Sequence, residues 1–425
     1  MSRDHQLPVA VTVKNCRLCQ STSLETVLDL GSTPLANDFR PWTAEPPNYD
    51  HFPLELLQCS DCGHTQLGII IDPGLLFRNY SYVSGTSTAF QRHFEALAHW
   101  LRNFLGLDSQ YPILEIGSND GTLLRYLLRA GYSAFGVEPA KNIFDSLEPE
   151  LQEHTYNEFF SASLVAKLRD QSKLFGAVIA NNVFAHIADL GAVIKDCHEL
   201  LVEDGYLIFE VSHVLRVLED CLFDTIYHEH LDYHSVFALS RFLRKHNFEI
   251  VEAIEVQTHG GSVRIVAKKM SHTQISGTFA SVSNIVSREL KVGVNSPQVF
   301  HNLAQRINEL KTRNLLLIDN LTNGGAQLAC FGAPAKLTTL LHVFHIHKGI
   351  FVFAVDDSPL KQSTWVPGGY FPVVSRSIAR EHGINSYFIS AWNFADSIIK
   401  SFDGQDCTFV TPLPKPHLVL SGVQR

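Results

Sequence analysis

The densest group of side chains able to do chemistry is the run Tyr227-His228-Glu229-His230. Residues 227–234 hold three histidines, one glutamate and two tyrosines. Histidine is the best general base at neutral pH because its unperturbed pKa lies near 6.5. On an extended segment the two outer histidines would share a face that the glutamate avoids, whereas a turn would let all three converge. The pattern favours catalysis, with a second metal site at the two histidines and a polar surface loop as alternatives.

Three other segments carry polar groups suited to a ligand. His186 closes the run NNVFAH after an apolar segment, at the mouth of a cofactor site. In His259-Gly260-Gly-Ser-Val-Arg264 the glycines permit close backbone approach, and the Arg264 fork suits a phosphate or carbonyl oxygen. A β-hairpin turn with Arg264 on its second strand is the alternative. Residues 80–88 offer hydroxyls for a lid or for sugar contacts, or form a plain linker.

Four of the eight cysteines form two Cys-x-x-Cys pairs, Cys16/Cys19 and Cys59/Cys62, with 39 residues between them. Two such pairs provide the closed tetrahedral shell of a structural zinc ion, whose four thiolates leave no position open for catalysis. A redox pair is the alternative, but it usually sits in a βαβ setting that this region lacks. His64 is a fifth candidate ligand that the four cysteines make unnecessary. The other four cysteines are predicted to be buried apolar residues.

A parallel α/β sheet is needed to position these groups, and the sequence predicts one from residue 111 onward. Apolar runs at 112–116, 133–137, 176–180 and 206–210 alternate with helical segments. The first run ends in the glycine turn EIGSNDG, and Glu138 follows Gly117 by 21 residues, a spacing that suits a ribose diol. This spelling departs from the G-x-G-x-x-G of NAD proteins and resembles the class I methyltransferase motif. An ordinary strand–helix turn is the alternative.

The resemblance to class I methyltransferases implies S-adenosylmethionine as cofactor. Phe160 is placed to bring an aromatic ring beside the adenine, and polar residues at a strand's carboxyl end face the ligand crevice of such sheets. The predicted cofactor-binding residues are Glu115, Gly117, Asn119, Asp120, Gly121, Glu138, Phe160, Asn181 and Asn182.

The predicted fold class is α/β with three domains. They are a zinc-bound domain at 1–75, a class I (Rossmann-like) core at 76–285 and, after a helical linker at 286–320, a smaller Rossmann-like α/β domain at 321–425. In the last domain residues 328–336 read as strand, turn and helix, and further strands are expected at 350–355 and from Tyr387.

Bulk composition excludes several partners. The 425 residues carry a net charge of −9 without a basic run, which argues against nucleic acid and against a nucleic-acid zinc ribbon. No run approaches the roughly 20 apolar residues of a membrane span, and no signal peptide is evident. We therefore expect a cytoplasmic protein that contacts no membrane and is a monomer or small homo-oligomer.

Together these motifs resemble the sugar C-methyltransferases, which methylate a carbon of a nucleotide-linked 4-keto-deoxy sugar. The resemblance covers nearly the whole chain: the cysteine pairs with GSTPLANDF between them, the core motifs EIGSNDG, NNVFAH, YHEH and HGGSVR, and the C-terminal domain. It implies a dTDP- or GDP-linked substrate and a C-terminal domain that helps bind it. Leu337 after Lys336 departs from the small residue usual in the family.

The resemblance also implies roles for individual residues. A C–H proton becomes removable beside the 4-keto group, so a base takes the C-3 proton and the enolate attacks the sulfonium methyl. We predict His230 as base with His228 as its rival, Tyr227 and His186 as donors to the enolate oxygen, and Glu229 as an orienting group. The predicted substrate contacts are Tyr80, Tyr82, His259, Gly260, Arg264, Lys336 and Lys361.

Two other functions stay open from the residues alone. One is an O- or N-methyltransferase of a sugar or small metabolite, which needs a base but no keto group. The other is a non-catalytic nucleotide-sugar binding protein, against which the intact glycine turn and YHEH run argue.

Overall fold

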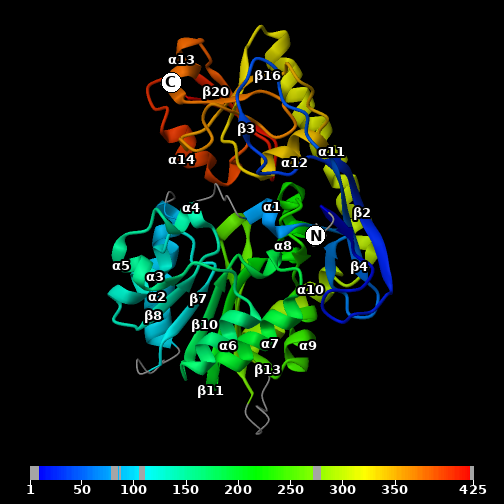
Figure 1. The fold of residues 1–425 in the computed structure, drawn as a ribbon. Helices are drawn as coiled ribbons and strands as arrows, with labels where there is room; N and C mark the ends of the chain where they lie inside the picture. The colour runs from blue at the N-terminus through cyan, green and yellow to red at the C-terminus, as the bar shows by residue number, and fades with distance from the viewer. Residues whose placement is uncertain (1–8, 78–84, 86–87, 105–110, 271–278, 422–425) are drawn as a thin grey trace, which may run out of the picture.

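A computed structural model describes residues 9–77, 85, 88–104, 111–270 and 279–421. Figure 1 shows an α/β core, a second α/β domain beside it, and a slender β module that runs along both. The fold class is α/β, as the alternation of strands and helices predicted.

The core holds a seven-stranded sheet in which five neighbouring strands are parallel and the two at one edge are antiparallel. Its spatial order is β13 (Phe248–Val256), β14 (Ser262–Lys269), β11 (Leu201–Ser212), β10 (Phe175–Asn181), β7 (Ile113–Ile116), β8 (Ala134–Val137) and β9 (Thr155–Tyr156). The four strands predicted here are confirmed as β7, β8, β10 and β11. Because parallel strands end at one edge, the residues after β7 and β10 lie together.

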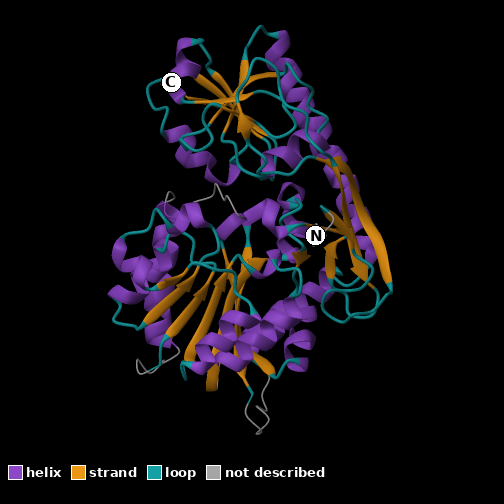
Figure 2. Cartoon of the chain, in the orientation of Figure 1, coloured by secondary structure: helices purple, strands orange, loops and turns teal. Residues whose placement is uncertain are grey.

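Helices cover both faces of this sheet (Figure 2), and each face buries a separate apolar layer. Side chains alternate along a strand, so Val178 and Ile179 of β10 belong to opposite layers. Val178 packs with α6 (Ala162–Asp170) and α7 (Leu190–Leu200), and Ile179 with α2 (Thr88–Phe104) and α3 (Thr122–Arg129). The remaining core helices are α4 (Lys141–Phe144), α5 (Pro149–Glu153), α8 (Val214–Asp220), α9 (Val236–Lys245) and the short η2 (Phe184–His186), η3 (Phe223–Thr225) and η4 (Thr258–Gly260).

The N-terminal module is a four-stranded antiparallel sheet in which one edge strand, β12, comes from the core. Its order is β12 (Asp232–Tyr233), β5 (Thr65–Leu67), β4 (Phe52–Cys59) and β2 (Leu24–Thr33). A small pair, β1 (Ala10–Thr12) with β6 (Ile69–Ile71), and α1 (Pro73–Phe77) complete it. Since β12 directly follows the YHEH run, the module is hydrogen-bonded to the segment that the sequence marked for catalysis.

The C-terminal domain holds an eight-stranded sheet, with one strand supplied by the N-terminal module. Its order is β21 (His417–Ser421), β20 (Cys407–Thr411), β19 (Ser386–Ile389), β15 (Leu328–Phe331), β16 (Phe351–Val355), β18 (Pro372–Val374), β17 (Thr364–Trp365) and β3 (Arg40–Pro41). Its helices are α12 (Lys336–Val343), α13 (Arg376–Glu381), α14 (Ala395–Lys400) and η5 (Trp392–Phe394). The predicted strands at 328, 350 and 387 are confirmed as β15, β16 and β19.

The helical segment between the domains is two helices rather than one. α10 (Ala280–Val292) ends at Gly293, whose φ of +88° is the left-handed conformation common at helix ends. α11 (Pro297–Asn323) then starts with a proline in its first turn and runs beside β2 toward the C-terminal domain (Figure 1).

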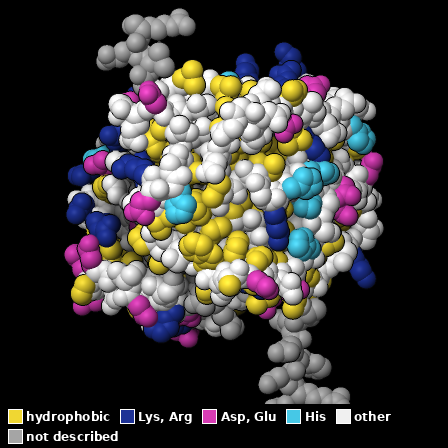
Figure 3. Space-filling model, turned by 90° about the horizontal axis from the view of Figure 1, so that it is seen from above, with side chains coloured by type: hydrophobic (Ala, Val, Ile, Leu, Met, Phe, Trp, Pro, Cys, Tyr) yellow, Lys and Arg dark blue, Asp and Glu magenta, His cyan; other side chains and the backbone are white. Residues whose placement is uncertain are grey.

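One continuous apolar cluster joins the module, α11, the η3 region and the C-terminal sheet. It includes Leu56, Phe223, Phe300 and Phe388, all nearly inaccessible to solvent. Viewed from the side of the C-terminal domain, the surface mixes both signs of charge around a central area of apolar side chains (Figure 3). No helix in the described ranges is long and apolar enough to cross a membrane.

Candidate active site

The predicted glycine turn lies at the carboxyl end of β7. Gly117 and Gly121 both have φ +69°, a conformation that side-chain-bearing residues adopt rarely. A Cβ on Gly117 would lie 2.5 Å from Cγ2 of Val183, in the loop after β10. Glycine is thus required at 117, because two strand ends meet there without room for a methyl group.

Acidic side chains fix the shape of this turn. Glu138, at the end of β8, accepts hydrogen bonds from the backbone N–H of Asn119 (2.8 Å) and of Ala140 (2.7 Å). Asp120 accepts from the Thr122 hydroxyl (2.7 Å) and from the Gly85 N–H (2.8 Å). Burial raises the pKa of Glu138. Side-chain hydrogen bonds therefore hold the backbone of this turn.

Several buried polar atoms around the turn have no protein partner among the described residues, as expected of a binding site. They are Oε2 of Glu115, Oγ of Ser118, and both amide atoms of Asn181 at the end of β10. Burial, with the charges of Asp120 and Glu138, raises the pKa of Glu115 well above its ordinary value. Buried polar groups are normally hydrogen-bonded, so these atoms fit a ligand with hydroxyl and amino groups such as S-adenosylmethionine.

Two other predicted cofactor residues, Phe160 and Asn182, already have contacts within the protein. Phe160 is half-buried and packs against the apolar layer of α6 and α7. Asn182 has φ +57°, and its N–H bonds the Glu210 carbonyl at 2.8 Å.

Three of the predicted catalytic side chains form one cluster beside this site. The rings of His186 and His230 lie 5.0 Å apart between centroids, and the Tyr227 ring lies 4.1 Å from that of His230. The Tyr227 hydroxyl is 2.9 Å from Nε2 of His230. Residues 227–230 form a turn, and the Leu231 N–H bonds the Ala185 carbonyl at 2.6 Å, which brings the two histidine segments together.

The contacts of His230 define its tautomer. Its Nδ1 lies 2.8 Å from the carbonyl oxygen of Thr225, which can only accept, so Nδ1 carries the hydrogen. Nε2 is then the basic nitrogen and accepts from the Tyr227 hydroxyl. Burial lowers the pKa of His186 to about 4, so this second ring is neutral at pH 7, and its buried Nδ1 has no partner among the described residues.

Glu229 lies in the same turn and contacts both outer domains. Asn37, within the GSTPLANDF segment, donates to it at 2.6 Å. This hydrogen bond and the positive charge of Lys361 both act to lower the pKa of Glu229. Burial nevertheless raises the pKa of Glu229 to about 7. Lys361 also donates to the Ala333 carbonyl at 2.8 Å, and burial lowers its pKa.

His228 has different neighbours from the other YHEH side chains. Its Nε2 lies 3.1 Å from the Pro53 carbonyl and 3.3 Å from that of Phe52, and its ring meets the Phe52 ring edge-on at 5.9 Å. These contacts place His228 against β4, whereas His230 faces His186. The two histidines do not converge on one ion.

Lys336 contacts a pair that the sequence reading missed. Its ammonium donates to the side-chain oxygen Oδ1 of Asn393 at 2.8 Å. It also lies 3.9 Å from the Asp224 carboxylate and 4.0 Å from the centre of the Trp392 ring. Trp392 donates to Asp224 at 2.6 Å. Burial lowers the pKa of Lys336 to about 8. Asp224 is three residues upstream of Tyr227, a proximity that offered a signal; Asn37 and Trp392 are remote in sequence and offered none.

The HGGSVR segment is the turn between β13 and β14, with Arg264 on β14. Arg264 pairs with buried Glu210 at 2.6 Å, and His93 contacts the same carboxylate at 2.8 Å. Gly260 has φ +94°, and a Cβ there would lie 3.2 Å from both Leu222 and Trp392. His259 lies in η4. Tyr80 and Tyr82 lie outside the described residues.

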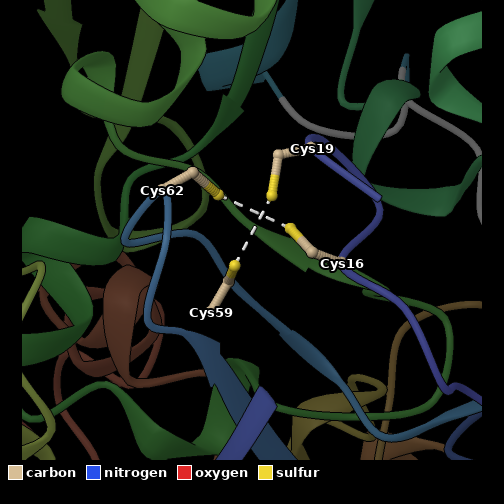
Figure 4. Close-up of side chains that lie close together, drawn as sticks. All are labelled: Cys16, Cys19, Cys59 and Cys62. Carbon is tan, nitrogen blue, oxygen red and sulfur yellow. Dashed lines mark hydrogen bonds between the residues drawn. The ribbon is translucent and has the colours of Figure 1, made fainter. Parts of the chain in front are cut away.

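The four predicted zinc ligands converge in the N-terminal module (Figure 4). Their sulfur atoms lie within 4.8 Å of one another, with Cys16–Cys62 and Cys19–Cys59 at 3.5 Å. Tetrahedral zinc with bonds of about 2.3 Å separates sulfurs by about 3.8 Å, so the cluster fits the ion. Gly63 (φ +74°) makes the tight turn expected after the second pair. His64 is bonded to Asp232 at 2.8 Å and is not needed as a ligand.

Three family models match successive parts of the chain. A putative zinc binding domain matches residues 16–77, a methyltransferase domain 90–253, and a C-methyltransferase C-terminal domain 257–414.

Individual known proteins are similar to the whole chain or to part of it. C-methyltransferase NovU of Streptomyces niveus is 28% identical over 96% of this chain and 97% of its own length. The mitochondrial ubiquinone biosynthesis O-methyltransferase of Bos taurus is 34% identical over 23% of this chain and 28% of its own. The magnesium protoporphyrin IX methyltransferase of Synechocystis PCC 6803, solved with bound S-adenosylmethionine, is 16% identical over 42% of this chain and 79% of its own, with a TM-score of 0.33.

The site and these matches together define an S-adenosylmethionine-dependent methyltransferase that also binds zinc. The chain joins a zinc-binding domain, a methyltransferase domain and a C-methyltransferase C-terminal domain in that order, and it is similar to a C-methyltransferase over nearly its whole length.

Proposed function

We propose that this enzyme transfers a methyl group to a carbon, C-3, of a nucleotide-linked 4-keto-deoxy sugar in branched deoxysugar biosynthesis. The observation that carries the proposal is the Tyr227–His230–His186 cluster, in which the basic nitrogen of one histidine lies among donors to an oxygen anion. A carbon acid beside a ketone needs this combination of base and anion stabilisation.

His230 removes the C-3 proton through Nε2. In the substrate-free arrangement the Tyr227 hydroxyl donates to Nε2, so we expect this hydroxyl to turn toward the keto oxygen when the sugar binds. That movement frees the base and supplies a donor to the developing enolate in one step. The neutral His186 ring lies beside this pair, and in the tautomer that carries its hydrogen on the partnerless Nδ1 it offers a second donor. His228 is a weaker candidate because its Nε2 is bonded to β4.

Bound S-adenosylmethionine supplies the electrophilic methyl group. Gly117, Asn181 and Glu115 would hold that cofactor at the carboxyl edge of the sheet, and methyl transfer to the enolate carbon would leave S-adenosylhomocysteine. Glu229, held by Asn37, orients a sugar hydroxyl.

The C-terminal domain, residues 321–425 in our division, supplies the groups for the dTDP or GDP part. Lys336 and Lys361 carry buried or nearly buried ammonium groups directed at the region of the YHEH turn, and their positive charge suits a diphosphate. We expect the reaction to take place in the cytoplasm.

Hydrogen exchange tests the carbon mechanism without methyl transfer. Incubation of the protein with dTDP- or GDP-linked 4-keto-deoxy sugars in D₂O, with S-adenosylhomocysteine in place of the methyl donor, should exchange the C-3 hydrogen. Added methyl donor should then give a C-methyl product. Absence of both exchange and C-methyl product for every sugar, with O- or N-methyl product instead, would overturn the proposal.

His230→Gln should abolish exchange while S-adenosylmethionine binding stays within about twofold of wild type. The exposed His417, at the start of β21, gives the control variant His417→Gln, which should exchange normally. If a folded His230→Gln protein exchanges C-3 at the wild-type rate, His230 is not the base.

A further inference from the structure

Arg17 lies inside the first zinc knuckle, between Cys16 and Cys19, yet its side chain points away from the cysteines. It is 7% exposed, and its guanidinium reaches the core. Nε donates to Asp232 at 2.8 Å, and Nη2 donates to the carbonyl of Ile187. A residue fixed at its backbone by two zinc ligands is therefore hydrogen-bonded to two core segments.

Both of those segments carry a catalytic histidine. Ile187 directly follows His186, and Asp232 lies two residues after His230. The Leu231 N–H to Ala185 carbonyl bond (2.6 Å) ties the same segments to each other. One planar guanidinium therefore bridges the two segments that carry these imidazoles.

The second knuckle reaches the same carboxylate. His64, two residues after Cys62, bonds Asp232 at 2.8 Å through Nε2, and neither side chain is accessible to solvent. Gln66 accepts from the Arg17 N–H at 2.8 Å and lies opposite Asp232 in the β5–β12 pair. Both knuckles thus converge on Asp232, a residue that the proposed chemistry does not use.

We propose that Arg17 and Asp232 are positioning residues that couple the zinc knuckles to the His186–His230 pair. With zinc bound the knuckles are rigid, and Arg17 transmits that rigidity to the spacing of the two rings. The zinc domain then contributes to turnover and not only to its own stability. The inference rests on the proposed function only for the identity of the reaction, because the ring positions can be measured without substrate.

The test replaces Arg17 in two ways in the full zinc-loaded chain. Arg17→Met keeps the apolar stem and removes every donor. Arg17→Lys keeps the positive charge beside Asp232, but one ammonium cannot reproduce the planar two-way fork. The second variant matters because loss of all charge leaves a buried carboxylate uncompensated and threatens folding. Arg241→Met is the matched control: Arg241 contacts the other knuckle at the Asp61 carbonyl (3.5 Å) from the exposed side.

Four readouts separate positioning from folding. Zinc content should stay at one per chain in all three variants, and S-adenosylmethionine affinity should stay within about twofold. The Cε1–H NMR signals of His186 and His230, assigned with His→Gln variants, should shift in both Arg17 variants and not in Arg241→Met. The kcat of both Arg17 variants should fall roughly 10- to 100-fold with KM little changed, with Arg17→Lys the less impaired.

Unshifted histidine signals and wild-type kcat in either zinc-loaded Arg17 variant would overturn the inference. Loss of zinc from both Arg17 variants would also overturn it, because Arg17 would then only support the knuckle. If the wild type exchanges no 4-keto sugar, the proposed function fails, and the histidine signals still decide whether the coupling exists.

Discussion

The cysteine cluster and the histidine cluster are each assembled from segments far apart in sequence, and no member of either is fully exposed. They differ in what their polar atoms face. The four sulfur atoms face one another within 4.8 Å and form a closed shell for one ion. In the histidine cluster a backbone carbonyl holds Nδ1 of His230 while Nε2 faces Tyr227, and Nδ1 of His186 has no partner among the described residues. A closed set of ligands stabilises structure, whereas an incompletely satisfied set is available for chemistry.

The two histidines of the YHEH turn differ in which part of the molecule they face. The Nε2–H of His228 donates to the carbonyl oxygens of Phe52 and Pro53 at the start of β4, so His228 supports the domain interface. His230, two residues on, lies among His186 and Tyr227. Two identical side chains in one turn therefore have different environments because the turn points them to opposite sides.

Removal of a zinc ligand should have the largest effect. Cys59→Ser opens the closed shell, and since structural zinc contributes on the order of 10 kcal/mol to folding in small domains, we expect loss of the metal, a strongly lowered Tm and loss of activity. Metal analysis and thermal unfolding measure this. Cys407→Ser, a lone cysteine of β20, should keep one zinc per chain. Full zinc retention in Cys59→Ser would show that the cysteines do not form the shell.

Loss of the base should have the next largest effect and should leave the fold intact. We expect His230→Gln to lower kcat roughly 10²- to 10⁴-fold, the usual contribution of a general base. His228→Gln should lower Tm more than His230→Gln does, because it loses the bonds to β4, and should retain a larger share of kcat. Steady-state kinetics and thermal unfolding of both variants test the contrast, which fails if the ranking on both measures is reversed.

Ionisation of the buried Glu229 beside the histidine cluster should lower the free energy of unfolding. Its folded pKa of about 7 lies above its ordinary value of 4.5, so the stability it allows is fully present below pH 4.5 and is lost as pH rises through 7. Glu229→Gln mimics the protonated form and should exceed wild type in unfolding free energy by up to about 3 kcal/mol at pH 8, with no such gain at pH 4.5. Denaturant unfolding from pH 4.5 to 8 tests this. The exposed Glu25→Gln is the control, and a pH-independent difference would contradict the assignment.

The cofactor edge should show the smallest change. Asn181 has both amide atoms buried without partners among the described residues, so Asn181→Ala should weaken S-adenosylmethionine binding about 3- to 30-fold through one or two lost hydrogen bonds. Calorimetric titration measures the affinity. Asn302→Ala, on the exposed side of α11, should bind as wild type does, and an equal affinity in Asn181→Ala would remove this residue from the cofactor site.

Local pattern was enough for the features that depend on neighbours in sequence. The spacing of the cysteines selects zinc because each knuckle is a local turn. The alternation of apolar runs with helical segments predicts the core strands, since burial against helices on both faces requires it. The glycines of EIGSNDG predict a tight turn at the end of β7, where Gly117 and Gly121 adopt left-handed backbone.

Tertiary structure decided what depends on residues distant in the chain. No local pattern separates His228 from His230, and only the packing of β4 and of η2 against one turn does so. Asn37 bonds Glu229 across 192 positions, and Arg17 bonds Asp232 across 215. Such contacts exist because β12 joins the N-terminal sheet and β3 joins the C-terminal sheet. Burial of one shared apolar cluster then brings distant segments together, because the hydrophobic effect depends on buried area and not on direction.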